Sequence, residues 1–142
     1  MKLVICDFNR TLYDPTTERL HPGALETLQY FRQHGAKVVI LSTESAGRAA
    51  LLERLGLTEY CEEIRFVHEK TKAVVLTLVD QYAVQPNEAL LIGDDPEGEL
   101  LIGRRLHLPT VAVGTGYCSP EIAMRMELPF YLSINDLTEM KL

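Results

Sequence analysis

Short apolar runs alternate with segments of helical spacing along the whole chain, and this alternation constrains the fold more than any other feature. Four continuous runs lie in order along the sequence, at residues 3–6, 38–41, 89–92 and 110–113. Uninterrupted apolar runs of this length are typical of strands buried on both faces of a parallel sheet. A weaker run is expected to form a strand at 64–67, and residues 130–134 are expected to add an edge strand before a short terminal helix.

The segments between these runs carry signals for helix starts and ends. Pro22 is expected in the first turn of a helix that Gly35 closes. A second helix over about residues 45–55 is expected to end at Gly56, and Thr71 suits the N-cap of a third. Strands alternating with helices predict a three-layer α/β/α sandwich with a mainly parallel central sheet.

Composition and charge exclude several functional classes. The 142 residues are 46% hydrophobic and 24% charged, which predicts a single globular domain over residues 1–142. A net charge of −6 argues against charge-driven binding to nucleic acid or to anionic membranes. No apolar run approaches the roughly 20 residues of a membrane span. Three cysteines, an odd number without a CxxC pair, favour a reduced, cytoplasmic location.

Polar side chains directly follow three of the apolar runs. Asp7 follows the first run, Ser42 and Thr43 follow the second, and Asp94 and Asp95 lie just beyond the third. Ligands of parallel α/β sheets bind beyond the carboxyl ends of the strands, where these residues are expected to meet. Carboxylates gathered there suit a hard, oxygen-ligated cation such as Mg²⁺.

The same edge of the sheet is expected to bind phosphate. Either Ser42 or Thr43 can donate a hydrogen bond to a phosphate oxygen, and the other can cap the following helix. Lys70, or alternatively Lys72, lies near a helix N-terminus and can neutralise charge on a phosphoryl group. A carboxylate such as Asp7, facing a metal-bound phosphoryl group, can attack it and form an aspartyl-phosphate that water then cleaves.

Four motifs appear in a fixed order along the chain. Residues 4–11 read V-I-C-D-F-N-R-T, the second apolar run ends in Ser42, Lys70 stands at a helix start, and the pair 94–95 follows another run. Glu99 fits a trailing acidic position of the last motif. In order and context, these motifs resemble those of the haloacid dehalogenase superfamily over essentially the whole chain.

The resemblance implies a fold, a cofactor and a role for each motif residue. It implies a haloacid-dehalogenase-like sandwich that uses Mg²⁺ and attacks phosphate esters through Asp7. The implied catalytic residues are Asp7, Asn9, Ser42 and Lys70. The implied metal-binding residues are Asp7, Asn9 through its backbone carbonyl, Asp94 and Asp95, with Glu99 as the alternative to Asp95.

Two positions depart from the pattern of the phosphatases in this superfamily. Asn9 stands where they carry a second Asp, the general acid and base, and Arg10 stands where they commonly carry Gly. Loss of a general acid or base typically slows a reaction by about 10²–10⁴-fold. The leading interpretation is therefore a slow Mg²⁺-dependent hydrolase of phosphate esters. The alternative is a catalytically silent domain that binds a phosphorylated ligand or a protein partner. A receiver-type signalling domain fits less well, because there the lysine follows the acidic pair.

The chain leaves little room for the cap domain that usually covers the site in this superfamily. The stretches after Thr11 and after Ser42 are short. The resemblance then implies a capless member, whose substrate covers the site itself or whose cover comes from a neighbouring subunit. The expected partners are a phosphorylated substrate, either a small molecule or a macromolecule, and a second copy of the chain in a homo-oligomer.

Overall fold

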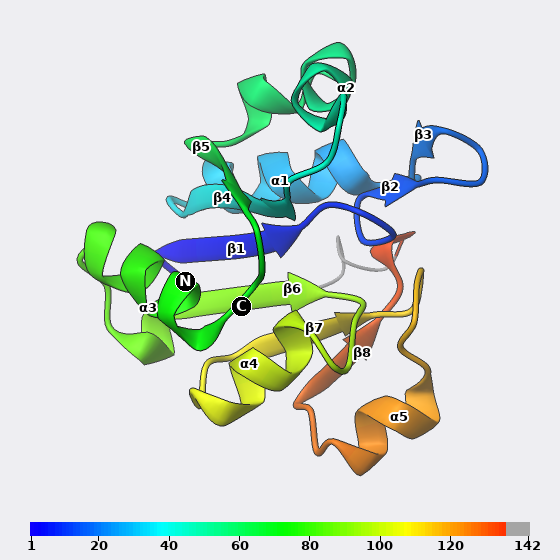
Figure 1. The fold of residues 1–142 in the computed structure, drawn as a ribbon. Helices are drawn as coiled ribbons and strands as arrows, with labels where there is room; N and C mark the ends of the chain where they lie inside the picture. Colours follow the sequence, from blue (N-terminus) through cyan, green and yellow to red (C-terminus); the bar gives the residue numbers. More distant parts are fainter. Residues whose placement is uncertain (136–142) are drawn as a thin grey trace.

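Six parallel strands form the central sheet of the protein, which a computed structural model describes over residues 1–135 (Figure 1). Their order across the sheet is β5-β4-β1-β6-β7-β8. The strands are β1 (Leu3–Asp7), β4 (Lys37–Thr43), β5 (Glu63–Val67), β6 (Ala89–Gly93), β7 (Thr110–Val113) and β8 (Phe130–Leu132). The chain builds outward from β1 on one side and then on the other, so the strand order reverses beside β1. Ligands of open α/β sheets bind at such a switch point.

Helices cover both faces of this sheet, as the sequence predicts. The helices are α1 (Ala24–Gln33), α2 (Arg48–Arg54), α3 (Lys72–Gln81), α4 (Glu99–Arg105) and α5 (Pro120–Arg125), with short 3₁₀ turns η1 (Leu57–Tyr60) and η2 (Pro86–Glu88). Figure 1 shows α1 and α2 on one side of the sheet and α3 and α4 on the other. Val4 and Cys6 pack in the core beneath α1 and α2, whereas Leu3 and Ile5 pack beneath α3 and α4. Both faces of β1 are therefore buried, which explains its unbroken apolar run.

The register of the central strands brings their carboxyl ends to one level. Asp7 of β1 pairs with Leu41 of β4, and Cys6 pairs with Ile92 of β6. Ser42 and Asp94 each follow within two residues of these pairs. Three segments far apart in the sequence thus deliver polar side chains to the same edge of the sheet.

The structure corrects two predicted helix starts. Pro22 does not lie in the first turn of α1, because Gly23 adopts a left-handed φ of 86° and the helix begins at Ala24. The second helix begins at Arg48 rather than near residue 45, again after a left-handed glycine, Gly47. The predicted cap at Thr71 is confirmed, since its hydroxyl accepts from the amide of Val74.

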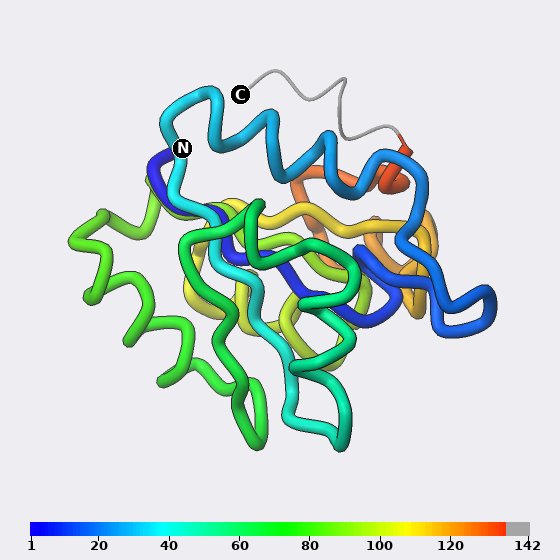
Figure 2. The backbone as a smooth tube through the Cα atoms, turned by 90° about the horizontal axis from the view of Figure 1, so that it is seen from above, coloured from blue at the N-terminus to red at the C-terminus, as the bar shows by residue number. Residues whose placement is uncertain are grey.

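Several elements lie outside the sequence predictions. Strands β2 (Tyr13–Asp14) and β3 (Arg19–Leu20) form an antiparallel hairpin that projects from the body of the molecule in both views (Figures 1 and 2). Helix α5 was also not predicted. The predicted edge strand is confirmed as β8, and the predicted terminal helix lies outside the described residues. Among residues 1–135, no helix has the length and hydropathy needed to cross a membrane.

Candidate active site

A cavity of about 320 Å³ lies at the carboxyl ends of β1, β4 and β6. Every residue that the family resemblance assigns to the site lines it. The full lining is Asp7, Asn9, Arg10, Ser42, Thr43, Arg48, His68, Glu69, Lys70, Asp94, Asp95, Glu97, Gly98 and Glu99. The fold therefore brings residues from five separate segments of the chain around one small space.

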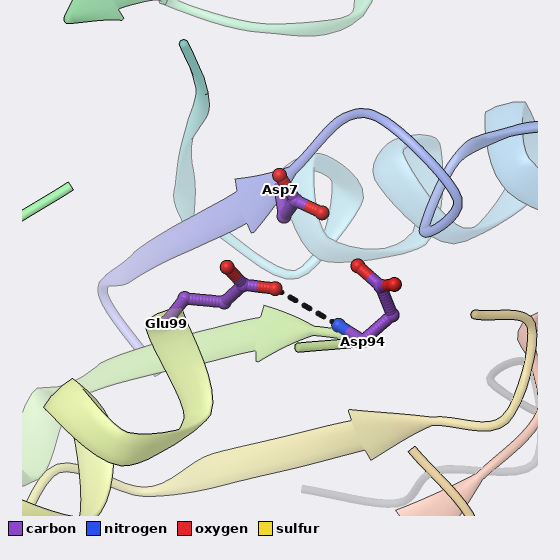
Figure 3. Close-up of side chains that lie close together, drawn as sticks. All are labelled: Asp7, Asp94 and Glu99. Atoms are coloured by element: carbon purple, nitrogen blue, oxygen red, sulfur yellow. Dashed lines mark hydrogen bonds between the residues drawn. The ribbon is translucent and has the colours of Figure 1, made fainter. Parts of the chain in front are cut away.

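Three buried carboxylates form the acidic centre of this cavity (Figure 3). Asp7 ends β1, Asp94 follows β6, and Glu99 opens α4. Each contributes one carboxylate oxygen to a group whose members all lie within 4.8 Å of one another. All three residues are at most 6% exposed. Buried charges of one sign at this spacing need a cation or hydrogen-bond donors to offset their repulsion.

Glu99, rather than Asp95, joins the acidic centre. The Oε1 atom of Glu99 accepts a hydrogen bond of 3.0 Å from the backbone amide of Asp94 (Figure 3). It accepts a second, of 3.1 Å, from the backbone amide of Asp95. Gly93 makes room for this arrangement, because a Cβ there would lie 2.1 Å from the Glu99 side chain. The Asp95 carboxylate instead accepts from the amide of Glu97 and shapes the turn before α4.

Hydrogen-bond donors in the loops after β1 and β7 hold the two aspartates. The Thr11 hydroxyl is fully buried and lies 2.8 Å from Oδ2 of Asp7 and 3.1 Å from Oδ1 of Asp94. With one proton, it can donate to only one of these carboxylates at a time. The other oxygen of Asp94 accepts from Nε of Arg10 at 3.3 Å and from the Tyr117 amide at 3.2 Å.

Lys70 supplies the positive charge nearest to the acidic centre. Its ammonium contacts Asp7 directly and lies 3.5 Å from Oε2 of Glu99. Burial, followed by the charge of Glu99, raises the pKa of Asp7 to about 8, while Lys70 acts in the opposite direction. Burial disfavours the charged form of Lys70, but Asp7 and Glu99 outweigh it and raise the pKa of the ammonium. The alternative lysine, Lys72, is exposed and does not line the cavity.

Ser42 and Thr43 reach the cavity from the end of β4 but differ in their surroundings. Ser42 is 1% exposed, and its hydroxyl accepts a hydrogen bond of 2.9 Å from Arg48. Thr43 is exposed, and α2 begins after Gly47 without a side-chain cap from either residue.

The two positions that depart from the superfamily pattern, Asn9 and Arg10, both line the cavity from the turn after β1. Arg10 holds a left-handed φ of 63°, and its guanidinium stacks on the ring of Tyr117 at 4.1 Å. The Thr115 hydroxyl donates to the Arg10 carbonyl at 2.6 Å and ties this turn to the loop after β7. A left-handed residue with a long side chain is uncommon, and these contacts compensate for its strain.

The donor set of the cavity suits a divalent cation. Six carboxylate residues line it, against three lysine or arginine residues. A phosphate dianion entering such a cavity would meet an excess of negative charge unless a cation came with it. Carboxylate and backbone oxygens are the ligands that Mg²⁺ prefers. The acidic centre can therefore hold a hard metal ion beside Asp7.

Sequence reasoning missed three contributors to the cavity. Thr11 belongs to the first motif, but the sequence predicts no role for it, and it predicts none for Arg48 or the Tyr117 amide. Gly116 is the sequence feature that could have indicated the Tyr117 amide, because a Cβ at Gly116 would lie 1.9 Å from Oδ2 of Asp94. Nothing in the local sequence marks Arg48, whose role depends on where α2 packs.

Comparisons with known proteins give a consistent picture. No curated protein sequence matches the chain. Three solved structures share the fold at low identity. A protein from Listeria monocytogenes serotype 4b has a TM-score of 0.73 and 20% identity, over 99% of this chain and 94% of that one. A Thermotoga maritima protein with a suggested β-phosphoglucomutase activity has a TM-score of 0.81 and 11% identity, over 98% and 97%. A D,D-heptose bisphosphate phosphatase from B. bronchiseptica, solved with magnesium and phosphate, has a TM-score of 0.74 and 16% identity, over 98% and 97%.

The family itself follows from a match to the chain's sequence. A family profile described as haloacid dehalogenase-like hydrolase matches residues 2–107. This range contains the acidic centre, Lys70 and Ser42. The chain therefore belongs to the haloacid dehalogenase-like hydrolase family.

Proposed function

We propose that this protein is a Mg²⁺-dependent phosphatase that removes a phosphoryl group from an ester through an aspartyl-phosphate on Asp7. The observation that carries the proposal is the convergence of Asp7, Lys70 and Asp94 in one small cavity. Phosphoryl transfer depends mainly on positioning and on charge stabilisation, and these residues can supply both.

Asp7 acts as the nucleophile in the first step. One of its carboxylate oxygens forms a bond to phosphorus while the ester P–O bond breaks, and the departing alkoxide takes up a proton from water. In the second step, water attacks the aspartyl-phosphate, releases inorganic phosphate and restores the carboxylate. Thr11 and Lys70 hold the Asp7 side chain at the end of β1 and limit its rotation.

Mg²⁺ would be held by the carboxylates of Asp7 and Asp94 and by the backbone carbonyl of Asn9. When bound, it supplies positive charge to the phosphoryl oxygens. Glu99 orients the backbone of Asp94 and balances the charge of Lys70, and Asp95 shapes the adjoining turn. Ser42 and Lys70 hold the transferring phosphoryl group from the β4 side of the cavity.

Asn9 limits the rate of this chemistry. In the family pattern, the second Asp of the first motif gives a proton to the leaving group and later helps to activate water. Asparagine can hydrogen-bond to the leaving oxygen but cannot exchange this proton. A rate about 10²–10⁴-fold below that of an enzyme with the general acid is therefore expected.

A second candidate function is a silent domain that binds a phosphorylated ligand or a protein. Asn9 favours it, and so does the ion pair between Arg10 and Asp94, which neutralises a carboxylate assigned to the metal. The intact pair of Asp7 and Lys70 favours the enzyme.

The expected substrate is a phosphorylated small molecule or macromolecule. Between β1 and α1 the described chain inserts only the β2–β3 hairpin, and between β4 and β5 only α2 and η1. We infer that cover for the cavity comes from the substrate or from a second subunit of a homo-oligomer.

Hydrolysis of a panel of phosphate monoesters, with and without Mg²⁺, tests the proposal. Wild type is compared with Asp7→Asn and with Asp80→Asn, which makes the same change at an exposed site on α3. We expect Mg²⁺-dependent release of phosphate that only Asp7→Asn abolishes. Equal rates for wild type and Asp7→Asn would reject the enzyme and favour the silent domain. Mass spectrometry after incubation with acetyl phosphate should also place a modification on Asp7.

A further inference from the structure

Arg48 is the cation of the cavity that forms no ion pair with a carboxylate in the described part of the chain. Lys70 is paired with Asp7 and Glu99, and Arg10 is paired with Asp94. Within residues 1–135, no carboxylate lies within ion-pair distance of Arg48. A half-buried guanidinium that faces a cavity without a counter-charge is ready to bind an anion from outside.

Two neighbouring side chains fix the direction of this guanidinium. One of its terminal nitrogens donates to Ser42 at 2.9 Å, and the guanidinium lies over the ring of Phe8 at 5.2 Å. Ser42 and Phe8 are both fully or almost fully buried, so neither can follow a moving partner. An arginine has five N–H donors, and the hydrogen bond to Ser42 uses one of them. The remaining donors form a planar fork that matches a carboxylate or a phosphate.

Charge is distributed unevenly around the cavity and favours an anion near Arg48. The lining from β4 and α2 consists of Ser42, Thr43 and Arg48 and has no carboxylate, whereas the segment 94–99 contributes four. A negatively charged group is therefore repelled from the β6 side and attracted to the β4 side. Arg48 lies one hydrogen bond beyond Ser42, the residue that we assign to the transferring phosphoryl group.

We propose that Arg48 determines specificity by binding a second anionic group, a carboxylate or a phosphate, of a small phosphorylated substrate. This inference rests on the proposed function, which places the phosphoryl group between Asp7 and Ser42. The cavity volume of about 320 Å³ lies in the range of small-molecule sites and accommodates a compact molecule with both groups.

Ligand binding to a protein that cannot turn over tests the role of Arg48 directly. In the Asp7→Asn background, calorimetry with Mg²⁺ compares ethyl phosphate with phosphoglycolate, which adds a carboxylate, and with ethylene glycol bisphosphate, which adds a phosphate. At least one of the two ligands with a second anionic group should bind 10-fold or more tightly than ethyl phosphate, and the tighter of the two identifies that group. Adding Arg48→Gln should reduce that ratio to near one, and Arg48→Lys should restore part of it.

Arg54→Gln is the matched control, because Arg54 is an exposed arginine at the other end of α2. It should leave the ratio unchanged. Equal weakening of all ligands by Arg48→Gln would overturn the inference, since Arg48 would then contact only the shared phosphoryl group. Equal affinity of the Asp7→Asn protein for the three ligands, with Arg48 intact, would overturn the inference as well. If Arg48→Gln does not fold, the ratio in Arg48→Lys decides, and an unchanged ratio there overturns the inference.

The outcome is separable from that of the proposed function. If phosphate release depends on Asp7 but the affinity ratio is the same with and without Arg48→Gln, only the inference is rejected. A ratio that depends on Arg48, in a protein whose wild type hydrolyses no ester, would reject only the phosphatase and would support a binding site for doubly anionic ligands.

Discussion

Replacing Thr11 with valine should destabilise the protein through the two buried aspartates that its hydroxyl serves. Valine has almost the same shape as threonine, so the substitution removes a donor without opening a cavity. Asp7 then retains Lys70 as its partner, and Asp94 retains Arg10 and a backbone amide. The loss therefore amounts to about one hydrogen bond to a charged group, which contributes about 1.5–3 kcal/mol.

Urea unfolding in Mg²⁺-free buffer at about pH 9, where Asp7 with its pKa of about 8 is ionised, followed by circular dichroism, measures this free energy of unfolding. Thr27→Val is the matched control, because Thr27 is equally buried but donates to the neutral carbonyl of Gly23 at 2.7 Å. A neutral hydrogen bond contributes about 0.5–1.5 kcal/mol. Equal m-values are required, so that the comparison reports native-state contacts.

Comparing the two variants separates the loss of a hydrogen bond to a charged carboxylate from the loss of a buried threonine hydroxyl in general. We expect Thr11→Val to cost about 1 kcal/mol more than Thr27→Val, the difference between the two kinds of hydrogen bond. Thr11→Ser keeps the hydroxyl and should recover most of that excess. A cost for Thr11→Val no greater than that of Thr27→Val would refute the view that the hydroxyl stabilises the acidic centre.

Three further predictions concern the site. Asn9→Asp should raise Mg²⁺-dependent turnover by about 10-fold or more, and the gain should vanish when Asp7→Asn is added; no gain in a folded protein would implicate another departure. Gly116→Ala should lower the free energy of unfolding by about 1–3 kcal/mol, because the added Cβ displaces the Asp94 carboxylate. The increase in melting temperature on adding Mg²⁺ should also be smaller than in the wild type. Because the pKa of Asp7 is raised to about 8, a proton competes with the cation, and Mg²⁺ affinity by calorimetry should rise by up to about tenfold per unit from pH 6 to pH 8; a flat profile would contradict this competition.

The sheet was predictable because its central strands are buried on both faces. Residues 3–6 and 89–92 show no polar interruption, and such runs leave few alternatives to a parallel sheet under two helical layers. The hairpin β2–β3 was not predictable in the same way, since its strands are two residues long and carry no alternation. Helix α5 spans six residues, too few for a periodic pattern to stand out.

The choice between Asp95 and Glu99 could not be made from residue type. Both are acidic and both follow β6 within a few positions. The structure separates them through the backbone: Gly93 leaves space for the Glu99 side chain, and the amides after β6 point toward its carboxylate. A side chain's partner in this region depends on the path of the turn between β6 and α4, which the sequence pattern does not specify.

The residues that build the sheet and the residue on which the proposed turnover rate depends are physically separate in this chain. Asn9 is only half-buried, in a turn beyond the end of β1, and it contributes nothing to the apolar runs that form the core. An aspartate of nearly the same size at this position would leave the strand register and the acidic centre in place. The fold therefore constrains the identity of residue 9 weakly, whereas the proposed proton transfer to the leaving group would need an acid at this position. The profile match over residues 2–107 therefore carries the family assignment, whereas in the proposed mechanism the rate depends on a residue that the fold does not require.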